Sequence, residues 1–310
     1  MPVLPLPSAP VVALAGGTGG AKLARGMLDV VGEDLVVIAN VGDDVEVHGA
    51  HVSPDPDLIA FWLADRIDAR GWGLDGDTFN AMDGLRDLGA EVWFDLGDRD
   101  LAIGLDRARR LAAGERLTDA LAALTASLGV CARVLPPTDD PLRTWVDDTP
   151  FQEWMIRAGG KAGERAIASV ELRGADAARP TPEVLAALAS ARAVIVGPSN
   201  PVISIGPILA VPGIREAIAA TRAPVVAVSP LVGGRAVKGP TEAFLAHAGL
   251  PVSADGIAAA YAGLLDGLIA DEACDALPTL QTDTDLSTPE ARRRVAQEVL
   301  AFAAALGSPQ

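Results

Sequence analysis

The chain has 310 residues, half of them hydrophobic and 4% aromatic, and carries a formal net charge of −16 at pH 7. This length can bury a large core, whereas the acidic excess argues against the clustered cations that a nucleic-acid surface requires. No apolar run approaches the roughly 20 uncharged residues of a membrane span, and residues 1–10 lack the basic start of a secretory signal, so we predict a cytoplasmic protein. Its two cysteines, Cys131 and Cys274, lie far apart and indicate neither a disulfide framework nor a zinc site.

Along the chain, short runs rich in Val and Ile alternate with longer amphipathic segments. Strands are expected at 11–15, 35–40, 193–196 and 224–228, and helices at 20–31, 57–69, 101–113, 118–128, 182–191, 213–221, 255–265 and 289–306. This alternation predicts an α/β fold, in which a Rossmann-like parallel sheet is covered by helices on both faces. Ligands of such a sheet gather beyond the carboxyl ends of its strands.

Residues 112–173 fit the alternation less well. Short strands at 130–135, 144–147 and 168–173 surround a polar loop there, so this region is predicted to be a cap inserted into a single domain that spans 1–310. The segment 277–288, rich in Thr, Asp and Ser, is expected to be a loop before the last helix.

The first predicted strand ends in a glycine-rich turn that opens a helix. Gly16, Gly17, Gly19 and Gly20 surround Thr18, and Lys22 follows. Glycine exposes bare backbone amides, and the first turn of a helix favours an anion, so this loop is interpreted as a phosphate site. Its spacing matches neither the P-loop nor the usual dinucleotide fingerprint. A turn that needs glycine only for packing is the alternative.

Two acidic clusters come after the second strand. Asp43 and Asp44 follow Asn40, and Asp55 and Asp57 follow Ser53. Loop carboxylates near a phosphate are typical ligands of a hard divalent cation, which favours Asp44 and Asp57 as functional residues. Alternatively, the Gly-Asp pair is an ordinary turn and Asp57 only caps the helix that begins there.

Three later junctions carry further candidates. The segment 96–100 contains Asp98, Arg99 and Asp100 before a helix, where a carboxylate could be only a cap. Ser199 and Asn200 follow the strand at 193–196 and suit recognition of a base or phosphate. The glycine loop at 233–239 carries Arg235 and Lys238, which are either phosphate ligands or solvated cations.

These motifs together resemble the 2-phospho-L-lactate transferase and phosphoenolpyruvate transferase family of coenzyme F-420 biosynthesis. The similar segments are 15–23, 40–44, 53–57, 96–100, 139–141, 151–152, 197–201, 204–208 and 229–240, in the order that the family shows. The resemblance implies a transferase domain that moves a phospholactyl or phosphoenolpyruvyl group from a guanosine diphosphate-activated donor to the ribityl hydroxyl of the deazaflavin Fo and releases GMP. It also implies Mg²⁺ as cofactor and a homodimer.

The resemblance implies roles for individual residues as well. Asp57 and Asp44 are the expected catalytic carboxylates, and Asp57 is expected to contact Fo from an exposed loop, as metal ligand or as acceptor of the nucleophile's proton. The expected metal ligands are Asp43, Asp44 and Asp57. The substrate-binding residues that the resemblance implies are Asp57, Asp95, Arg99, Gly17, Thr18, Gly19, Gly20, Lys22, Ser199, Asn200 and Lys238.

Two departures from the family pattern affect the acceptor side. Asp95 stands where the family usually has Arg or Lys in contact with Fo, and Ile103 and Gly104 replace a usual Thr-His pair. The first change replaces a cation by an anion, and the second removes polar groups that could orient a ligand.

Two other functions remain as alternatives. A non-catalytic regulator that binds a nucleotide-sugar would share the glycine loop, and a nicotinamide-dependent oxidoreductase would share the fold. The second alternative is the weaker one, because the second strand ends in Asn40 and not in the acidic residue that holds a ribose.

Overall fold

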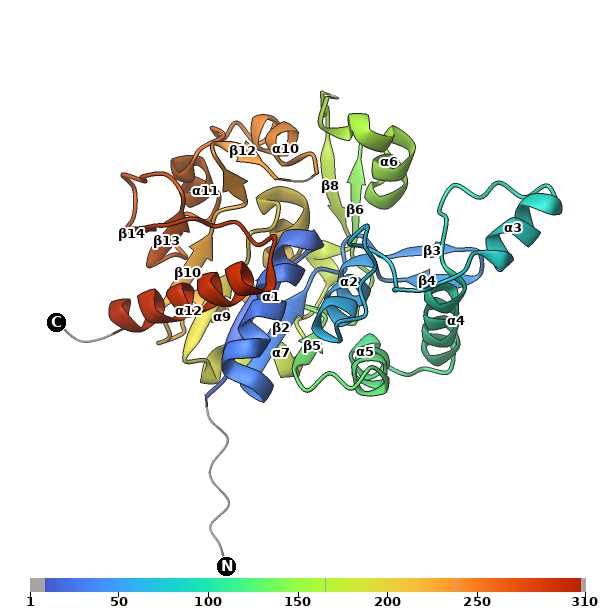
Figure 1. Cartoon of the computed structure of the whole chain (residues 1–310), viewed down its shortest axis with the longest axis horizontal. Helices are drawn as coiled ribbons and strands as arrows, with labels where there is room; N and C mark the ends of the chain where they lie inside the picture. The colour runs from blue at the N-terminus through green and yellow to red at the C-terminus, as the bar shows by residue number, and fades with distance from the viewer. Residues whose placement is uncertain (1–8, 165, 238, 308–310) are drawn as a thin grey trace, which may run out of the picture.

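A computed structural model describes residues 9–164, 166–237 and 239–307. Its centre is a seven-stranded, entirely parallel sheet, which confirms the predicted α/β fold (Figure 1). The strand order is β14-β13-β10-β9-β1-β2-β5. Their bounds are β1 Val11–Ala15, β2 Leu35–Ala39, β5 Arg133–Leu135, β9 Ala193–Val196, β10 Val225–Val228, β13 Gly267–Ala270 and β14 Thr279–Gln281.

The chain reverses its direction of travel across the sheet between β1 and β9. From β1 it builds outward through β2 to β5, and then returns to β9 on the other side of β1. Such a switch point leaves an open crevice at the carboxyl ends of the two central strands. The fold therefore predicts a ligand site where β1 and β9 end.

Alternate residues of the strands build separate cores on the two faces of the sheet. Val11 and Ala13 of β1 pack with α1 (Gly17–Val31), α2 (Pro54–Leu63) and α12 (Pro289–Leu306). Val12 and Leu14 face the other way, toward the helices α5 (Leu117–Ser127), α7 (Pro182–Ser190), α8 (Gly206–Ala210), α9 (Ile214–Ala219), α10 (Thr241–His247) and α11 (Ala254–Ala260).

Two peripheral units border the carboxyl edge of the sheet. One contains the hairpin of β3 (Val45–Val47) and β4 (Ala50–Val52), which packs with α3 (Asn80–Asp87) and α4 (Asp98–Ala112) around a small core of its own (Figure 1). The other is an antiparallel sheet in the order β7-β6-β8, with α6 (Phe151–Ala158) beside it. Its strands are β6 Arg143–Val146, β7 Thr149–Pro150 and β8 Val170–Arg173.

The predicted cap at 112–173 is therefore wrong in its extent. β5 pairs in parallel with β2 and completes the main sheet, and α5 belongs to the main core. β5 has only three residues, and its first residue, Arg133, is exposed, so its apolar signal was too weak to separate it from the strands that follow.

Other elements were missed or misplaced. β13 was not predicted, and β14 lies inside the segment 277–288 that was expected to be a loop. α1 begins three residues earlier than predicted. Shorter elements complete the chain: η1 Gly32–Asp34, η2 Gly159–Glu164, η3 Ala175–Ala177, η4 Pro201–Ile205, β11 Leu231–Val232 and β12 Arg235–Ala236.

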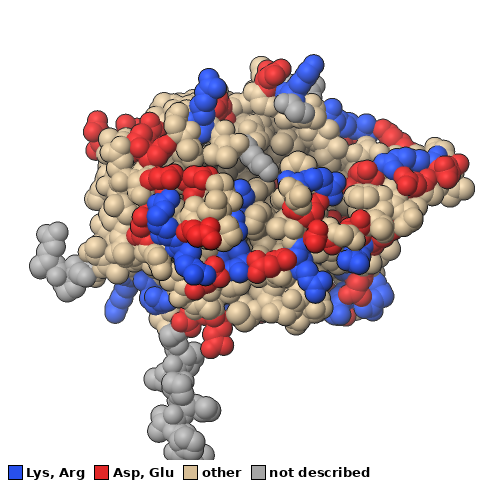
Figure 2. All heavy atoms as spheres, in the orientation of Figure 1, with Lys and Arg blue, Asp and Glu red and all other residues tan. Residues whose placement is uncertain are grey.

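Acidic and basic side chains are intermixed over the face that Figure 2 shows, with no continuous basic patch. This surface lacks the electrostatic footprint of a nucleic-acid binder. Within the described residues, no helix is both long and apolar enough to cross a membrane.

Candidate active site

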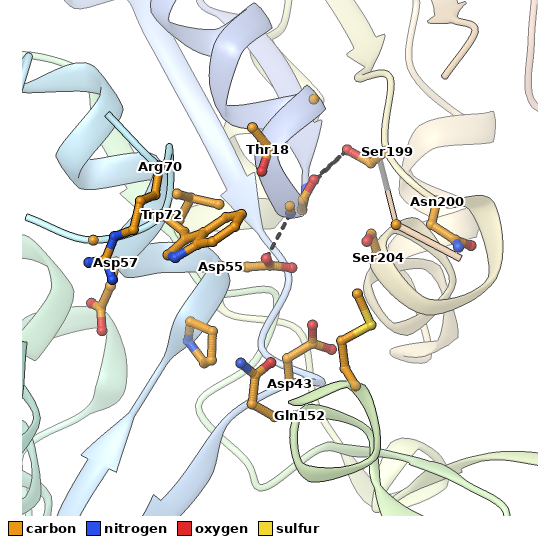
Figure 3. Close-up of a pocket in the computed structure, with 18 of the residues that line it drawn as sticks. Thr18, Asp43, Asp55, Asp57, Arg70, Trp72, Gln152, Ser199, Asn200 and Ser204 are labelled. Atoms are coloured by element: carbon orange, nitrogen blue, oxygen red, sulfur yellow. Dashed lines mark hydrogen bonds between the residues drawn. The ribbon is translucent and has the colours of Figure 1, made fainter. Parts of the chain in front are cut away.

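A cavity of about 810 Å³ opens at the carboxyl edge of the sheet. Its wall combines the turns after β1 and β9, the start of α2, the loop before α3, the segment 93–100 and α6 (Figure 3). This volume suits a nucleotide together with a second small molecule. The cavity coincides with the switch point of the sheet.

The glycine turn forms one end of this cavity. Gly17, at φ 59°, starts α1, and its N–H donates to Asp55 Oδ1 at 2.7 Å. Ser199 accepts from the Gly16 N–H and donates to the Gly16 carbonyl at 2.7 Å, which fastens the turn to the loop after β9. Among the described residues, the N–H groups of Thr18 and Gly19 have no acceptor. They remain available to an anion at the helix N-terminus.

Packing explains three of the four glycines in this turn, since a Cβ on Gly16 would lie 2.7 Å from both Asp55 Oδ2 and Ser204 Cβ. A Cβ on Gly19 would collide with the carbonyl oxygen of Pro198, and one on Gly20 would lie 2.6 Å from Ser199 Oγ. Gly19 also lines the cavity, whereas Gly20 does not. The packing alternative is therefore right for Gly20, which was predicted to bind substrate.

Asp43 and Asp55 form a buried carboxylate pair beside the turn. Asn40 Nδ2 donates to Asp43 Oδ1 at 3.2 Å and to Asp55 Oδ2 at 2.9 Å, and within the described residues neither carboxylate has an ion-pair partner. Burial and the Asp55 charge raise the pKa of Asp43 well above its usual range. Burial likewise raises the pKa of Asp55 to about 6, against hydrogen bonds from Asn40 and Gly17. Two buried acids without a cation need a proton or a metal ion.

Asp44 points into a different network from that of Asp43. It accepts from Ser53 Oγ at 2.6 Å and pairs with His51 Nε2 at 3.0 Å, and it does not line the cavity. Although burial by itself lowers the pKa of His51, hydrogen bonds with Asp44 and Glu46 raise it to about 9. The imidazolium therefore neutralises Asp44, which holds the β3–β4 hairpin together.

Asp57 is buried, contrary to the expected exposed loop. It lies in the first turn of α2 and is paired through both of its oxygens with Arg107 of α4, which was not predicted. Arg107 also donates to the His51 carbonyl at 3.0 Å. Burial raises the pKa of Asp57, but the Arg107 charge opposes this effect. Figure 3 shows the Asp57 carboxylate directed away from Asp43 and Asp55.

The described residues contain no group of three or more His, Cys, Asp and Glu side chains placed to hold a metal ion. Asp43, Asp44 and Asp57 thus do not form the predicted cluster, because each has a different set of partners. The pair that the structure brings together is Asp43 with Asp55. The alternating acids at 55 and 57 were visible in the sequence, but only the structure shows that Asp55 faces the glycine turn.

Another part of the cavity wall is aromatic. We name the residues that form it the aromatic lobe: Arg70, Trp72, Phe79, Trp93, Phe94, Asp77 and Asp100. Arg70 lies over the Phe79 ring, with 5.6 Å between its Cζ and the ring centroid. Such surfaces suit a planar ring. No pattern in the sequence grouped these residues, because they come from two separate segments, 70–79 and 93–100.

The structure shows how the two residues that depart from the family pattern fit their neighbours. Asp95 lines the cavity and pairs with Arg86 of α3 at 2.8 Å, so a cation accompanies the substituted carboxylate. A Cβ on Gly104 would lie 2.9 Å from the Ala50 Cβ. A histidine at that position would push α4 away from β4.

Four predicted substrate-binding residues remain: Lys22, Asn200, Arg99 and Lys238. Lys22 and Asn200 line the cavity, and Asn200 Oδ1 also accepts from the N–H of Val202 at the start of η4. Arg99 is exposed and does not line the cavity. Lys238 lies outside the described residues.

The sequence is similar to those of known transferases. A profile of the family described as 2-phospho-L-lactate transferase CofD matches residues 11–299. The chain is 40% identical, over 92% of its length and 97% of the relative, to a phosphoenolpyruvate transferase of Kitasatospora aureofaciens. It is 37% identical, over 84% of its length and 87% of the relative, to a 2-phospho-L-lactate transferase of Methanosarcina mazei.

A solved structure shares the fold at lower sequence identity. The crystal structure of a UPF0052 family protein from Bacillus halodurans superposes with a TM-score of 0.57 at 18% identity, over 95% of this chain and 99% of that one.

Proposed function

The chain belongs to the 2-phospho-L-lactate transferase CofD family, and we propose that it transfers a phosphoenolpyruvyl or 2-phospho-L-lactyl group to the ribityl hydroxyl of Fo. The donor is the guanosine diphosphate-activated acid, and GMP is released. One observation carries this proposal: a single cavity joins an anion-binding helix start, a buried carboxylate pair and an aromatic lobe. Both named classes of relative are transferases, which favours a transferase over a non-catalytic regulator.

The glycine turn is the proposed site of the donor's diphosphate. The N–H groups of Thr18 and Gly19 would donate to it, and the dipole of α1 would add to their attraction. Lys22, one turn further along α1, lines the same wall. In our proposal the nucleoside side of the donor lies beside the loop after β9, where Ser199 and Asn200 line the cavity.

Asp43 and Asp55 fit a divalent cation, in our proposal Mg²⁺. Mg²⁺ is held by one or two carboxylates together with phosphate oxygens and water, which matches this pair beside a phosphate site. When bound, the ion would neutralise charge on the diphosphate. Without it, burial favours the protonated form of each acid, as their raised pKa values indicate.

The transfer itself needs positioning and charge neutralisation more than covalent catalysis. The ribityl oxygen forms a bond to the transferred phosphorus and gives its proton to solvent water, and the bond from that phosphorus to the GMP oxygen breaks. Asp57 orients the acceptor in our proposal. Its bidentate pairing with Arg107 makes it a weak proton acceptor, so proton removal is not assigned to it.

The experiment that tests this function supplies purified protein with Fo, Mg²⁺ and each guanylylated donor in turn. We expect GMP release and a product heavier than Fo by the phosphoacyl group, and the faster donor identifies the transferred acid. Absence of GMP with both donors, while circular dichroism shows a folded protein, would falsify the proposal.

A matched pair of variants tests the metal assignment. We expect Asp55→Asn to lower kcat by about 100-fold or more without unfolding the protein, because it replaces an uncompensated buried acid by a neutral isostere. Asp106→Asn, an exposed change on α4 at a carboxylate paired with Arg109 and Arg110, should leave kcat unchanged. Equal kcat values for the wild type and Asp55→Asn would remove Asp55 from the site.

The homodimer and the cytoplasmic location are also proposals, supported by the family resemblance alone. Light scattering after gel filtration checks the first, with twice the chain mass of 31.7 kDa expected.

A further inference from the structure

Asp100 differs from every other carboxylate near the aromatic lobe. It lies in the first turn of α4, is partly buried and lines the cavity. Among the described residues, no hydrogen bond or ion pair holds its carboxylate, although its own N–H donates to Asp77.

The neighbouring acids, by contrast, are all satisfied. Asp57 pairs with Arg107, and Asp77 accepts from the N–H groups of Arg99 and Asp100. Asp98 accepts from Thr78 Oγ1 and from Asn80. The Asp100 carboxylate faces the cavity without a partner among the described residues, whereas the acids around it are all hydrogen-bonded or paired within the protein. An unpaired, partly buried carboxylate lowers the stability of the fold, and no contact within the described part of the chain offsets this loss.

Burial and the neighbouring charges destabilise the ionised form of Asp100 further. Burial is the main reason that the pKa of Asp100 rises to about 7, and the negative charges of Asp57, Asp77 and Asp68 add to it. Arg107 is the opposing positive charge, and it is already shared with Asp57. Perturbed carboxyl groups in a cleft are typical of functional sites.

We propose that Asp100 is a specificity-determining residue for the acceptor: its carboxylate accepts a hydrogen bond from an N–H or O–H group of a planar molecule that lies against the aromatic lobe. The assignment rests on the proposed function, because the acceptor is the substrate that reaches this end of the cavity. Trp72, with 59% of its surface exposed, and Phe79 offer the ring surfaces, and Asp100 lines the same cavity and supplies the polar contact.

The proposal predicts how acceptor binding changes with pH. Above about pH 7 the carboxylate is ionised and accepts the hydrogen bond, whereas below it the carboxyl is neutral and a poorer acceptor. The KM for the acceptor should therefore rise as the pH falls through 7. The donor's KM should not follow this curve, because in our proposal the donor binds the glycine turn, which is formed by other residues than the aromatic lobe.

The test compares Asp100→Asn and Asp100→Ala with the wild type and with Asp106→Asn as control on the same helix. Loss of a hydrogen bond to a charged group is worth about 10- to 100-fold in affinity. We expect the KM for Fo to rise by that factor in both Asp100 variants, with the Kd for GDP unchanged and the rise of KM below pH 7 abolished. Their Tm should be equal to or above that of the wild type, since a destabilising charge is removed.

The outcomes separate this inference from the proposed function. If the wild type transfers to Fo while Asp100→Asn keeps the KM, the pH profile and the calorimetric Kd for Fo of the wild type, the assignment of Asp100 is overturned and the function stands. If the wild type binds GDP but neither binds nor uses Fo, the proposed function fails first. A fall in Tm and a weaker affinity for GDP in both variants would show that Asp100 is structural, which also overturns the inference.

Discussion

At the scale of single residues, Arg107 and Asp57 join α4 to α2 through an ion pair whose side chains are 2% and 8% exposed. Removing one partner of a buried pair leaves an uncompensated charge, which costs about 3–5 kcal/mol. We expect Arg107→Met to lower the free energy of unfolding by that amount in urea titrations. The double variant Arg107→Met/Asp57→Leu should recover much of the loss, since it buries no charge. Strict additivity of the two single effects would show that the residues are not coupled.

A second residue-scale prediction concerns Tyr261. Its ring is 2% exposed in the main core, and its hydroxyl has no hydrogen-bond partner among the described residues. Burying a hydroxyl without a partner costs about 1–3 kcal/mol, so Tyr261→Phe should leave stability unchanged or raise it. Tyr261→Ala should lose about 3–5 kcal/mol, because it deletes the ring. A clear loss of stability in Tyr261→Phe would show that the hydroxyl is bonded.

At the scale of elements, Asp77 caps a helix from outside it. The N-cap residue of α4 is Gly97, which has no side chain, and Asp77 instead accepts from the N–H groups of Arg99 and Asp100 at 3.0 and 3.2 Å. Loss of a cap costs about 0.5–2 kcal/mol. We expect Asp77→Ala to speed amide exchange at these two residues and to raise the KM for the acceptor, because Asp100 sits on the same turn. Asp77→Asn keeps an accepting oxygen, so its exchange rates at these two residues should lie between those of the wild type and those of Asp77→Ala. If exchange in Asp77→Ala is the same as in the wild type, Asp77 is not a cap.

The same scale shows where prediction from sequence succeeds. Strands β1, β2, β9 and β10 are continuous apolar runs that only a doubly covered parallel sheet accommodates, and all four were predicted to within one residue at each end. β5 and β14 are short, edge-lying and half polar, so their pairing with β2 and β13 depends on long-range contacts that no local pattern encodes. Asp98 likewise serves as a cap for α3 and not for its own helix.

At the scale of the whole molecule, the topology brings distant segments to one cavity. The predicted Gly17, Thr18, Ser199 and Asn200 meet there because parallel strands end at the same edge of the sheet. The aromatic lobe was not predictable in this way, since its aromatic residues lie outside the helices and strands. Asp57 lines the cavity, but it is buried and not exposed as predicted. The sequence did not show this, because its partner Arg107 is fifty positions away.

This arrangement predicts two separable footprints in hydrogen exchange. GDP with Mg²⁺ should slow exchange in residues 17–20, 40–44 and 197–204, whereas Fo should slow it in 70–79 and 93–100, since a ligand that binds only the native state protects the segments it orders. The two ends share one wall at α2, so both ligands together should protect residues 53–57 more than either one alone. Asp100→Asn should reduce the second footprint and leave the first intact. Protection of 70–79 by GDP alone would mean that the nucleotide occupies the aromatic lobe, and the assignment of donor and acceptor ends would have to be reversed.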